Sequence, residues 1–206
     1  MNIKHRDDIS DSVIHFTKPK SHISANTFDS TNEKEIKGFL EESLNVFIKI
    51  MEEKTLLAGT TFIKGNFNCI CFTEAPISKL PSVFSNRVLN KIRYAPYGFM
   101  FKKKWLYKNG ARPVIYGPES DYNCLDENLK YRYVKYNLES DPEIDFTWER
   151  EWRLKTQSLQ FDPSDVTLVV PNRAVVDSIR YKDGGDPHSN WHFIALSDLG
   201  LELDSI

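Results

Sequence analysis

The densest group of chemically capable side chains lies in residues 146–154, where two tryptophans bound a run of charges. Glu149 and Glu151 alternate there with Arg150, and Arg153 follows. The segment runs into apolar residues, which is typical of the start of a β-strand. One interpretation is a carboxylate at a pocket, held rigid by packed indoles. The other is an edge strand with a solvated charged face and a Glu–Arg pair, which stabilises a protein only weakly.

The strand pattern assigns these side chains to two faces, because the side-chain period of a strand is two. Glu149, Glu151 and Arg153 would share one face, lining a cleft or a rim. The opposite face should be buried and comprises Trp148, Arg150, Trp152 and Leu154. We expect truncation of such an indole to cost about 3–5 kcal/mol of stability, and Glu151→Gln to leave the Tm nearly unchanged or to raise it.

A second candidate site lies early in the chain. His15, Phe16 and Thr17 close an apolar strand before a polar loop, and strand ends often carry functional groups. A strand histidine also commonly fills the core or hydrogen-bonds the backbone, so both interpretations stay open.

Two later segments could also contribute to a site. Thr73 or Glu74 precedes Pro76, an arrangement that favours capping of a following helix. Arg93 and Tyr97 lie in a segment that joins a cation to aromatic rings just before a strand. That combination fits either a nucleotide platform or a rim of core tyrosines.

Familiar catalytic and metal-binding motifs do not occur in the sequence. It has no phosphate loop, no G-x-G-x-x-G and no G-x-S-x-G. Cys69, Cys71 and Cys124 fit neither a disulfide framework nor a zinc spacing, and His188 and His192 lack the acid of a metalloprotease motif. We therefore predict no metal site and a reducing, cytoplasmic environment.

The length and charge of the chain bound the remaining possibilities. Its 206 residues, 40% hydrophobic and 27% charged, suffice for one core, so a single domain over 1–206 is expected, with 1–12 as a loose leader. The net charge of -2 gives no global basic field that would recruit nucleic acid, although a local patch could. No apolar run approaches the roughly 18 residues of a membrane span, so no membrane partner is expected.

The hydrophobic pattern predicts one long helix early in the chain and many short strands late. Apolar residues spaced by three and four predict a helix from about Glu33 to Lys54, and a second helix is expected over 77–89. The expected strands are 13–17, 67–73, 97–101, 113–116, 151–155, 166–170, 178–181 and 191–195, with a turn or short helix starting at 102–104 and an ambiguous segment at 131–136. This order indicates an α+β protein with a mixed or antiparallel sheet.

Taken in order, these pieces resemble a bacterial family of abortive phage infection, the AbiGi-like proteins, and a related family with a Glu-Trp-Arg signature. The resemblance spans roughly residues 13–171. It rests on His15-Phe16-Thr17, a helix, Cys71-Phe72-Thr73-Glu74-Ala75-Pro76, Tyr97-Gly98, Pro113-Val114-Ile115-Tyr116 and Glu149-Arg150-Glu151-Trp152-Arg153.

The layout is also similar to the DarT family of ADP-ribosyltransferase toxins, in which an N-terminal strand grips NAD and a late strand begins with the catalytic Glu. This similarity implies an ADP-ribosyltransferase-like domain that cleaves the nicotinamide–ribose bond of NAD and modifies a macromolecule. Glu151 would be the catalytic carboxylate and Glu149 would orient the acceptor. The implied NAD-binding residues are His15, Phe16, Thr17, Thr73, Arg93 and Tyr97.

The acceptor implied by the resemblance is a phage protein, a cognate defence-system protein or a nucleic acid. A single dinucleotide site would require Glu151, His15 and Arg93 to converge on one small pocket. The sequence has no clear match to the catalytic arginine of the DarT pattern, and Arg93 is the nearest candidate.

Two alternatives stay open. The missing arginine fits a catalytically inactive sensor or binding module of an anti-phage system. A metal-dependent nuclease is the other alternative, because Glu151-Trp152-Arg153 resembles the Glu-x-Lys half of a restriction-type site, with Asp141 or Asp145 as the second acid.

Overall fold

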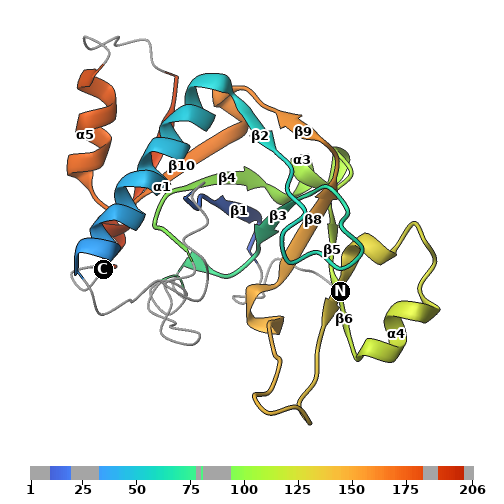
Figure 1. Ribbon diagram of the computed structural model, residues 1–206. Coiled ribbons are helices and arrows are strands. Elements are labelled where there is room, and N and C mark those ends of the chain that lie inside the picture. Colours follow the sequence, from blue (N-terminus) through green and yellow to red (C-terminus); the bar gives the residue numbers. More distant parts are fainter. Residues whose placement is uncertain (1–9, 20–32, 78–79, 81–93, 183–189, 202–206) are drawn as a thin grey trace. The chain divides into compact units, whose positions relative to one another are not determined.

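A computed structural model describes residues 10–19, 33–77, 80, 94–182 and 190–201 of the chain. Over these residues the protein is α+β, and its main sheet has seven strands of mixed direction (Figure 1). The expected fold class and the mixed sheet are therefore confirmed. The chain divides into two compact units: the first comprises 1–15, 55–76 and 101–160, and the second comprises 16–54, 77–100 and 161–206.

The first unit contains most of the strands that position the candidate carboxylates. Within it the main-sheet strands follow the order β1-β3-β8-β5, and β3 pairs antiparallel with both β1 and β8. Two small ladders accompany them, antiparallel β2–β9 and parallel β6–β7. The elements are β1 (Ser12–Phe16), β2 (Thr55–Leu57), β3 (Cys69–Thr73), α3 (Lys103–Lys108), β5 (Arg112–Pro113), β6 (Ile115–Gly117), α4 (Glu119–Cys124), β7 (Tyr133–Lys135), β8 (Glu151–Lys155) and β9 (Ser158–Gln160).

The second unit is built around α1 (Glu33–Glu53), the long helix that the apolar spacing predicts. Its buried residues, among them Phe39, Phe47 and Met51, recur at about helical period, because one stripe of an amphipathic helix faces the core. Phe47 contacts Phe99 with ring centroids 4.9 Å apart, and Phe99 contacts Phe161 at 5.7 Å. The unit also contains the parallel pair β10 (Val166–Val170) and β11 (His192–Ala195), whereas β1, through Phe16, and β4 (Gly98–Lys102) contribute residues to both units.

The predicted strand at 178–181 is wrong, because these residues belong to helix α5 (Arg173–Lys182). Val176 and Ile179 are buried while the residues between them are exposed, which is a helical spacing. The side chain of Asn172 accepts a hydrogen bond from the backbone N–H of Val175 at 3.1 Å, so it caps the first turn.

The predicted strand at 113–116 is in fact two short strands, β5 and β6, in different sheets. The division falls at Val114, whose N–H donates to the carbonyl of Glu151 at 3.0 Å. Most of the predicted helix over 77–89 lies outside the described residues, as do residues 1–9 of the expected leader, and β1 already begins at Ser12. The single-domain expectation stays a prediction.

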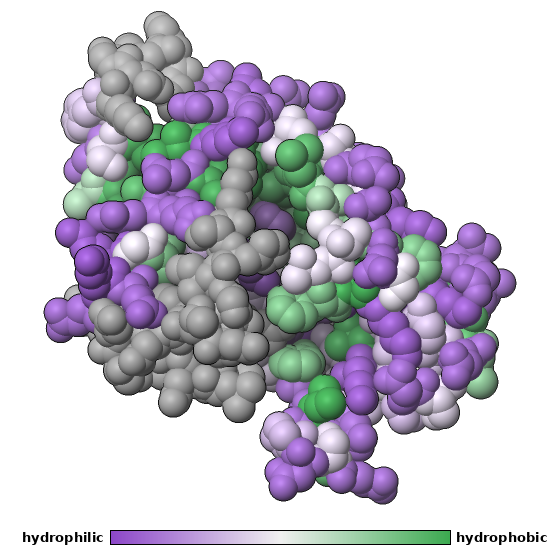
Figure 2. Space-filling view, in the orientation of Figure 1, coloured by the Kyte–Doolittle hydropathy of each residue, from purple (hydrophilic) through white to green (hydrophobic). Residues whose placement is uncertain are grey.

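Several large apolar side chains are solvent-exposed, and the face in view in Figure 2 shows apolar groups scattered among hydrophilic ones. Among the described residues, Phe62 is the most exposed of them at 84%, followed by Tyr181 at 75% and Leu57 at 69%. Among the helices that the structure describes, none has the length and apolar character that a membrane crossing requires.

Candidate functional site

The segment from residue 147 to 155 does not form one continuous strand. Thr147–Glu149 is a turn of 3-10 helix, and Arg150 adopts a left-handed conformation with φ 45° before β8 begins at Glu151. The turn interrupts the period of two, so Glu149 is not on the strand face of Glu151. Trp148 lies in this turn rather than on β8 and is only half-buried, whereas Trp152 is 7% exposed, so the prediction that both tryptophans are buried on one strand face is wrong.

The strand predicted at 151–155 is confirmed as β8, but it is not an edge strand, since it lies between β3 and β5. Within β8 the expected alternation holds for Trp152 and Leu154, which are both buried. Arg153 on the other face is buried as well, at 4% exposure, so this face is covered rather than solvated.

Glu151 and Arg153 form an ion pair in which both carboxylate oxygens accept hydrogen bonds. Arg153 donates from Nε to Oε1 of Glu151 at 2.8 Å and from Nη2 to Oε2 at 3.2 Å. Nη1 of Arg153 donates to the backbone carbonyls of Tyr131 and Tyr133, both at 2.9 Å. Burial lowers the pKa of Arg153, but the hydrogen bonds and the charge of Glu151 outweigh burial and leave that pKa raised. The Glu–Arg pair of the structural interpretation therefore exists, in a buried setting.

Tyr116 and Thr73 lie beside this pair and act on the backbone around it. The N–H of Glu151 donates to the hydroxyl of Tyr116 at 3.1 Å, and burial raises the pKa of Tyr116 to about 12. Thr73 stands opposite Glu151 in the β3–β8 register. Its hydroxyl donates to the carbonyl of Glu149 at 2.5 Å and accepts from the N–H of Ala75 at 3.1 Å. Thr73 thus ties the end of β3 to the turn before β8, whereas the helix it was expected to cap lies mostly outside the described residues.

His15 lies on the face of the sheet opposite to Glu151. In the β1–β3 register Ile14 stands opposite Thr73, so His15 points to the other side, with Phe72. Their ring centroids are 5.9 Å apart, and Nδ1 of His15 donates to the carbonyl of Cys71 at 2.8 Å. The expected convergence of His15 with Glu151 on one face is therefore not found.

The face of His15 also carries Trp152, which alternates with Glu151 along β8. The indole N–H of Trp152 donates to Oε2 of Glu74 at 2.8 Å, and Nζ of Lys103 donates to Oε1 of Glu74 at 2.7 Å. Glu74 thus satisfies the polar end of a buried indole, a role that the sequence did not reveal because Trp152 lies 78 residues away.

The other residues implied for NAD binding belong to the second unit or lie outside the described residues. Thr17 is 1% exposed, and its N–H and hydroxyl both donate to the carbonyl of Tyr97, at 2.9 and 3.1 Å. Tyr97 is buried with its ring 5.8 Å from Phe47, and burial raises its pKa. Phe16 contacts Tyr94 at 5.9 Å. Thr17 and Tyr97 thus fit core positions in the second unit, and Arg93 lies among the residues that are not described.

The two acids that a nuclease would use with Glu151, Asp141 and Asp145, are both exposed. Asp145 is exposed and accepts hydrogen bonds from the N–H and hydroxyl of Thr147, which lower the pKa of its carboxyl group. Among the described residues, no three His, Cys, Asp or Glu side chains are grouped so that they could hold a metal ion.

Comparison of the chain with protein-family models, curated proteins and solved structures finds no match. The site must therefore be interpreted from its own geometry. That geometry is a carboxylate at the first residue of a central strand, fixed on both oxygens by a buried guanidinium.

Proposed function

We propose that the protein is an NAD-dependent enzyme of the ADP-ribosyltransferase type, in which Glu151 is the catalytic carboxylate. The observation that carries the proposal is the state of Glu151 at the start of β8. Its side chain is 12% exposed and held on both oxygens by Arg153, so it can reach a ligand without being free to move. A preorganised charge of this kind stabilises a transition state without reorganising when the reaction occurs.

The chemistry would place positive charge beside this carboxylate. When the bond between nicotinamide and C1′ of the ribose breaks, nicotinamide leaves as a neutral molecule and the ribose develops oxocarbenium character. A nucleophile of the acceptor then forms the new bond to C1′ and loses its proton to solvent or to a nearby base. Each carboxylate oxygen has two acceptor sites, so the pairing with Arg153 leaves Glu151 with capacity for the substrate.

The remaining assignments follow from the geometry of the first unit. Glu149 is 5% exposed and lies in the turn before β8, so we assign the chemistry to Glu151 and give Glu149 a supporting role in the turn. His15 points to the opposite face, so it would not touch the same part of a ligand as Glu151. The sequence resemblance adds the biological setting to this proposal: a cytoplasmic phage-defence or toxin-type protein whose acceptor is a phage protein, a defence-system protein or a nucleic acid.

Titration of the purified protein with NAD, followed by mass detection of ADP-ribose on proteins and nucleic acids of a cell lysate, tests the proposal. We expect NAD binding and an acceptor carrying ADP-ribose, with Glu151→Gln still binding NAD but leaving the acceptor unmodified. A folded protein that neither binds NAD nor modifies any acceptor would refute the proposal.

A binding module without catalysis is the second candidate, and one observation favours it. Both oxygens of Glu151 already accept hydrogen bonds from a buried arginine, as they would in a purely structural pair. Such a protein would bind a phage component or a nucleotide. Glu151→Asp, which would abolish catalysis in an enzyme, should then leave phage defence intact. Loss of defence in those folded variants would argue against the binding module.

A further inference from the structure

The sequence separates its charges strongly in the region around α3. Residues 75–118 contain nine Lys and Arg and no Asp or Glu, although the whole chain has a net charge of -2. Four of these cations lie outside the described residues. The other five lie in the first unit: Lys102, Lys103, Lys104, Lys108 and Arg112.

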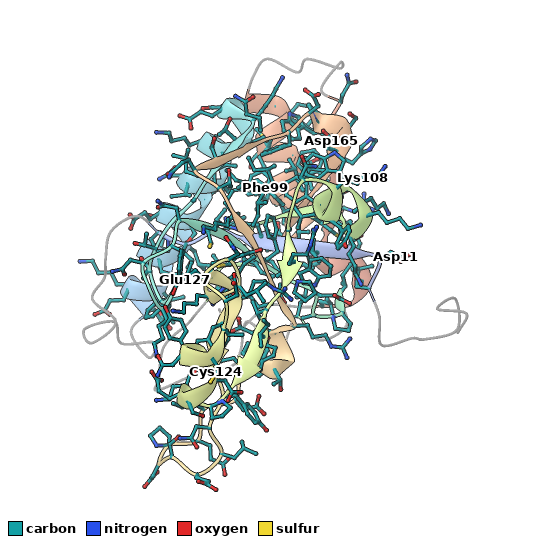
Figure 3. All side chains as sticks on the ribbon, turned by 90° about the vertical axis from the view of Figure 1, so that its right-hand side faces the viewer. Asp11, Phe99, Lys108, Cys124, Glu127 and Asp165 are labelled. Carbon is teal, nitrogen blue, oxygen red and sulfur yellow. The ribbon has the colours of Figure 1, made fainter. Side chains whose placement is uncertain are left out.

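Of these five residues, only Lys103 forms an ion pair with an acidic residue that the structure describes. Lys102, Lys104 and Lys108 are exposed and form no ion pair with any other residue that the structure describes. Lys103 differs, because it is paired with Glu74. The backbone carbonyl of Asp11, which precedes β1, accepts a hydrogen bond from the backbone N–H of Lys103 at 2.8 Å. Asp11 and Lys108 are labelled in Figure 3. The charge of Glu74 is thus matched by Lys103.

Aromatic groups are interleaved with these cations. Tyr107 is 51% exposed, and the guanidinium carbon of Arg112 lies 3.9 Å from the centre of its ring. Arg112 also donates to the carbonyl of Tyr107 at 2.9 Å, which holds the stack in place. A depression of about 260 Å³ lies beside it, lined by Lys103, Lys104, Tyr107, Lys108 and Trp152.

We propose that the α3 surface, formed by Lys102, Lys104, Tyr107, Lys108 and Arg112, binds single-stranded nucleic acid. Lys104 and Lys108 are four residues apart on α3 and so lie on the same side of the helix, where both can contact phosphates. The Tyr107–Arg112 stack offers a planar group to an unpaired base, which is how sequence-tolerant single-strand binders gain affinity. An acidic peptide would match the charge but would have no use for this stack.

The α3 surface is distinct from the site proposed for catalysis. Trp152, which borders the depression, alternates with Glu151 on β8, so the two side chains point to opposite faces of the sheet. The nucleic acid bound there would hold the protein near its place of action rather than enter the reaction. The inference therefore does not depend on the chemistry of Glu151.

Fluorescence anisotropy with labelled single-stranded DNA and RNA of roughly 20 nucleotides, titrated at several salt concentrations, tests the proposal. In a plot of the logarithm of the binding constant against the logarithm of the salt concentration, each phosphate contact to a single strand contributes about -0.7 to the slope. Lys104→Gln/Lys108→Gln should weaken binding about tenfold or more and make the slope shallower by about 1.4. The matched control, Lys37→Gln/Lys49→Gln, removes two exposed lysines of α1 and should change neither quantity.

A second variant tests the aromatic part of the surface. Tyr107→Leu should weaken binding of the single strand about fivefold or more while leaving duplex binding unchanged, because paired bases are not available to stack. Thermal melts confirm that each variant is folded. Three results would each overturn the proposal. The α3 variant could bind as tightly as the α1 control, the affinity could be independent of salt concentration, or poly-glutamate could displace the labelled strand as effectively as unlabelled single-stranded nucleic acid does.

Discussion

At the level of single residues, the Glu151–Arg153 pair serves stability and the proposed chemistry at once. Arg153 is buried, and its hydrogen bonds to Glu151, Tyr131 and Tyr133 satisfy a charge that would otherwise be costly to bury. The same bonds hold the Glu151 carboxylate in one position. A substitution in either residue should therefore affect stability, whatever it does to activity.

The first prediction concerns this pair. Arg153→Met leaves the Glu151 carboxylate and two buried carbonyls without their donor, so we expect a loss of about 3–5 kcal/mol in the free energy of unfolding. Glu151→Gln keeps one acceptor oxygen and should lower the free energy of unfolding by about 1–3 kcal/mol. This expectation replaces the one drawn from the sequence, which was an unchanged Tm. Urea unfolding measures both, and the double variant gives the coupling energy.

The control for this prediction is Arg173→Met in α5. Arg173 donates to Asp198 at 2.8 Å, but its side chain is 79% exposed, so solvent screens the pair and its loss should destabilise the protein far less than the loss of Arg153. Similar small losses for Arg153→Met and Arg173→Met would show that the Glu151–Arg153 pair is not a buried one.

The second prediction concerns two of the three cysteines, Cys69 and Cys124. Cys124 is exposed, whereas Cys69 is buried and burial raises the pKa of its thiol, although Arg153 and Lys155 act in the opposite direction. Because the thiolate is the reactive species, iodoacetamide should alkylate Cys124 first and Cys69 only when the protein unfolds. Mass spectrometry of peptides over time gives the order, and early modification of Cys69 in the folded protein would contradict it.

At the level of elements, the sequence predicts best where one periodic pattern runs through a whole element. α1, β8 and β10 follow from the spacing of their apolar residues. The left-handed turn at Arg150 could not be predicted, because no glycine marks it and the flanking charges continue the pattern of a strand. The burial of Arg153 was also hidden, since the carbonyls that accept its hydrogen bonds lie about 20 residues away in the chain.

The third prediction uses the same turn. Trp152→Ala should cost about 3–5 kcal/mol, because the indole is buried on the sheet and hydrogen-bonded to Glu74. Trp148→Ala should cost clearly less, because Trp148 lies half-buried in the 3-10 turn. Chemical unfolding of the two variants provides the comparison. Equal losses would mean that the two indoles share one buried face, as a continuous strand would require.

At the level of the whole molecule, buried tyrosines should limit stability at alkaline pH. Burial raises the pKa values of Tyr97, Tyr116 and Tyr133 in the folded protein. The unfolded chain loses these protons near pH 10, its ordinary value, while folded Tyr116 keeps its proton until about pH 12. Their contribution to stability is therefore complete below about pH 10 and is lost as the pH rises toward 12.

The fourth prediction follows from this linkage. Tyr116→Phe should lower stability at neutral pH by about 1–3 kcal/mol, because the N–H of Glu151 loses its acceptor. The same variant should lose less stability than the wild type between neutral and alkaline pH. Urea unfolding across this range measures both effects, with the exposed Tyr107→Phe as control. A wild-type stability that stays constant up to pH 12 would contradict the prediction.

The measurement that tests the central claim most directly is the release of nicotinamide from NAD by the purified protein. We expect the wild type to release nicotinamide and Glu151→Gln to be slower by a factor on the order of 10²–10³, the effect of removing one electrostatic contact from a transition state. Trp148→Phe, which alters the neighbouring turn but not the carboxylate, should retain the wild-type rate. Equal rates in wild type and folded Glu151→Gln, or no release by either, would contradict the account.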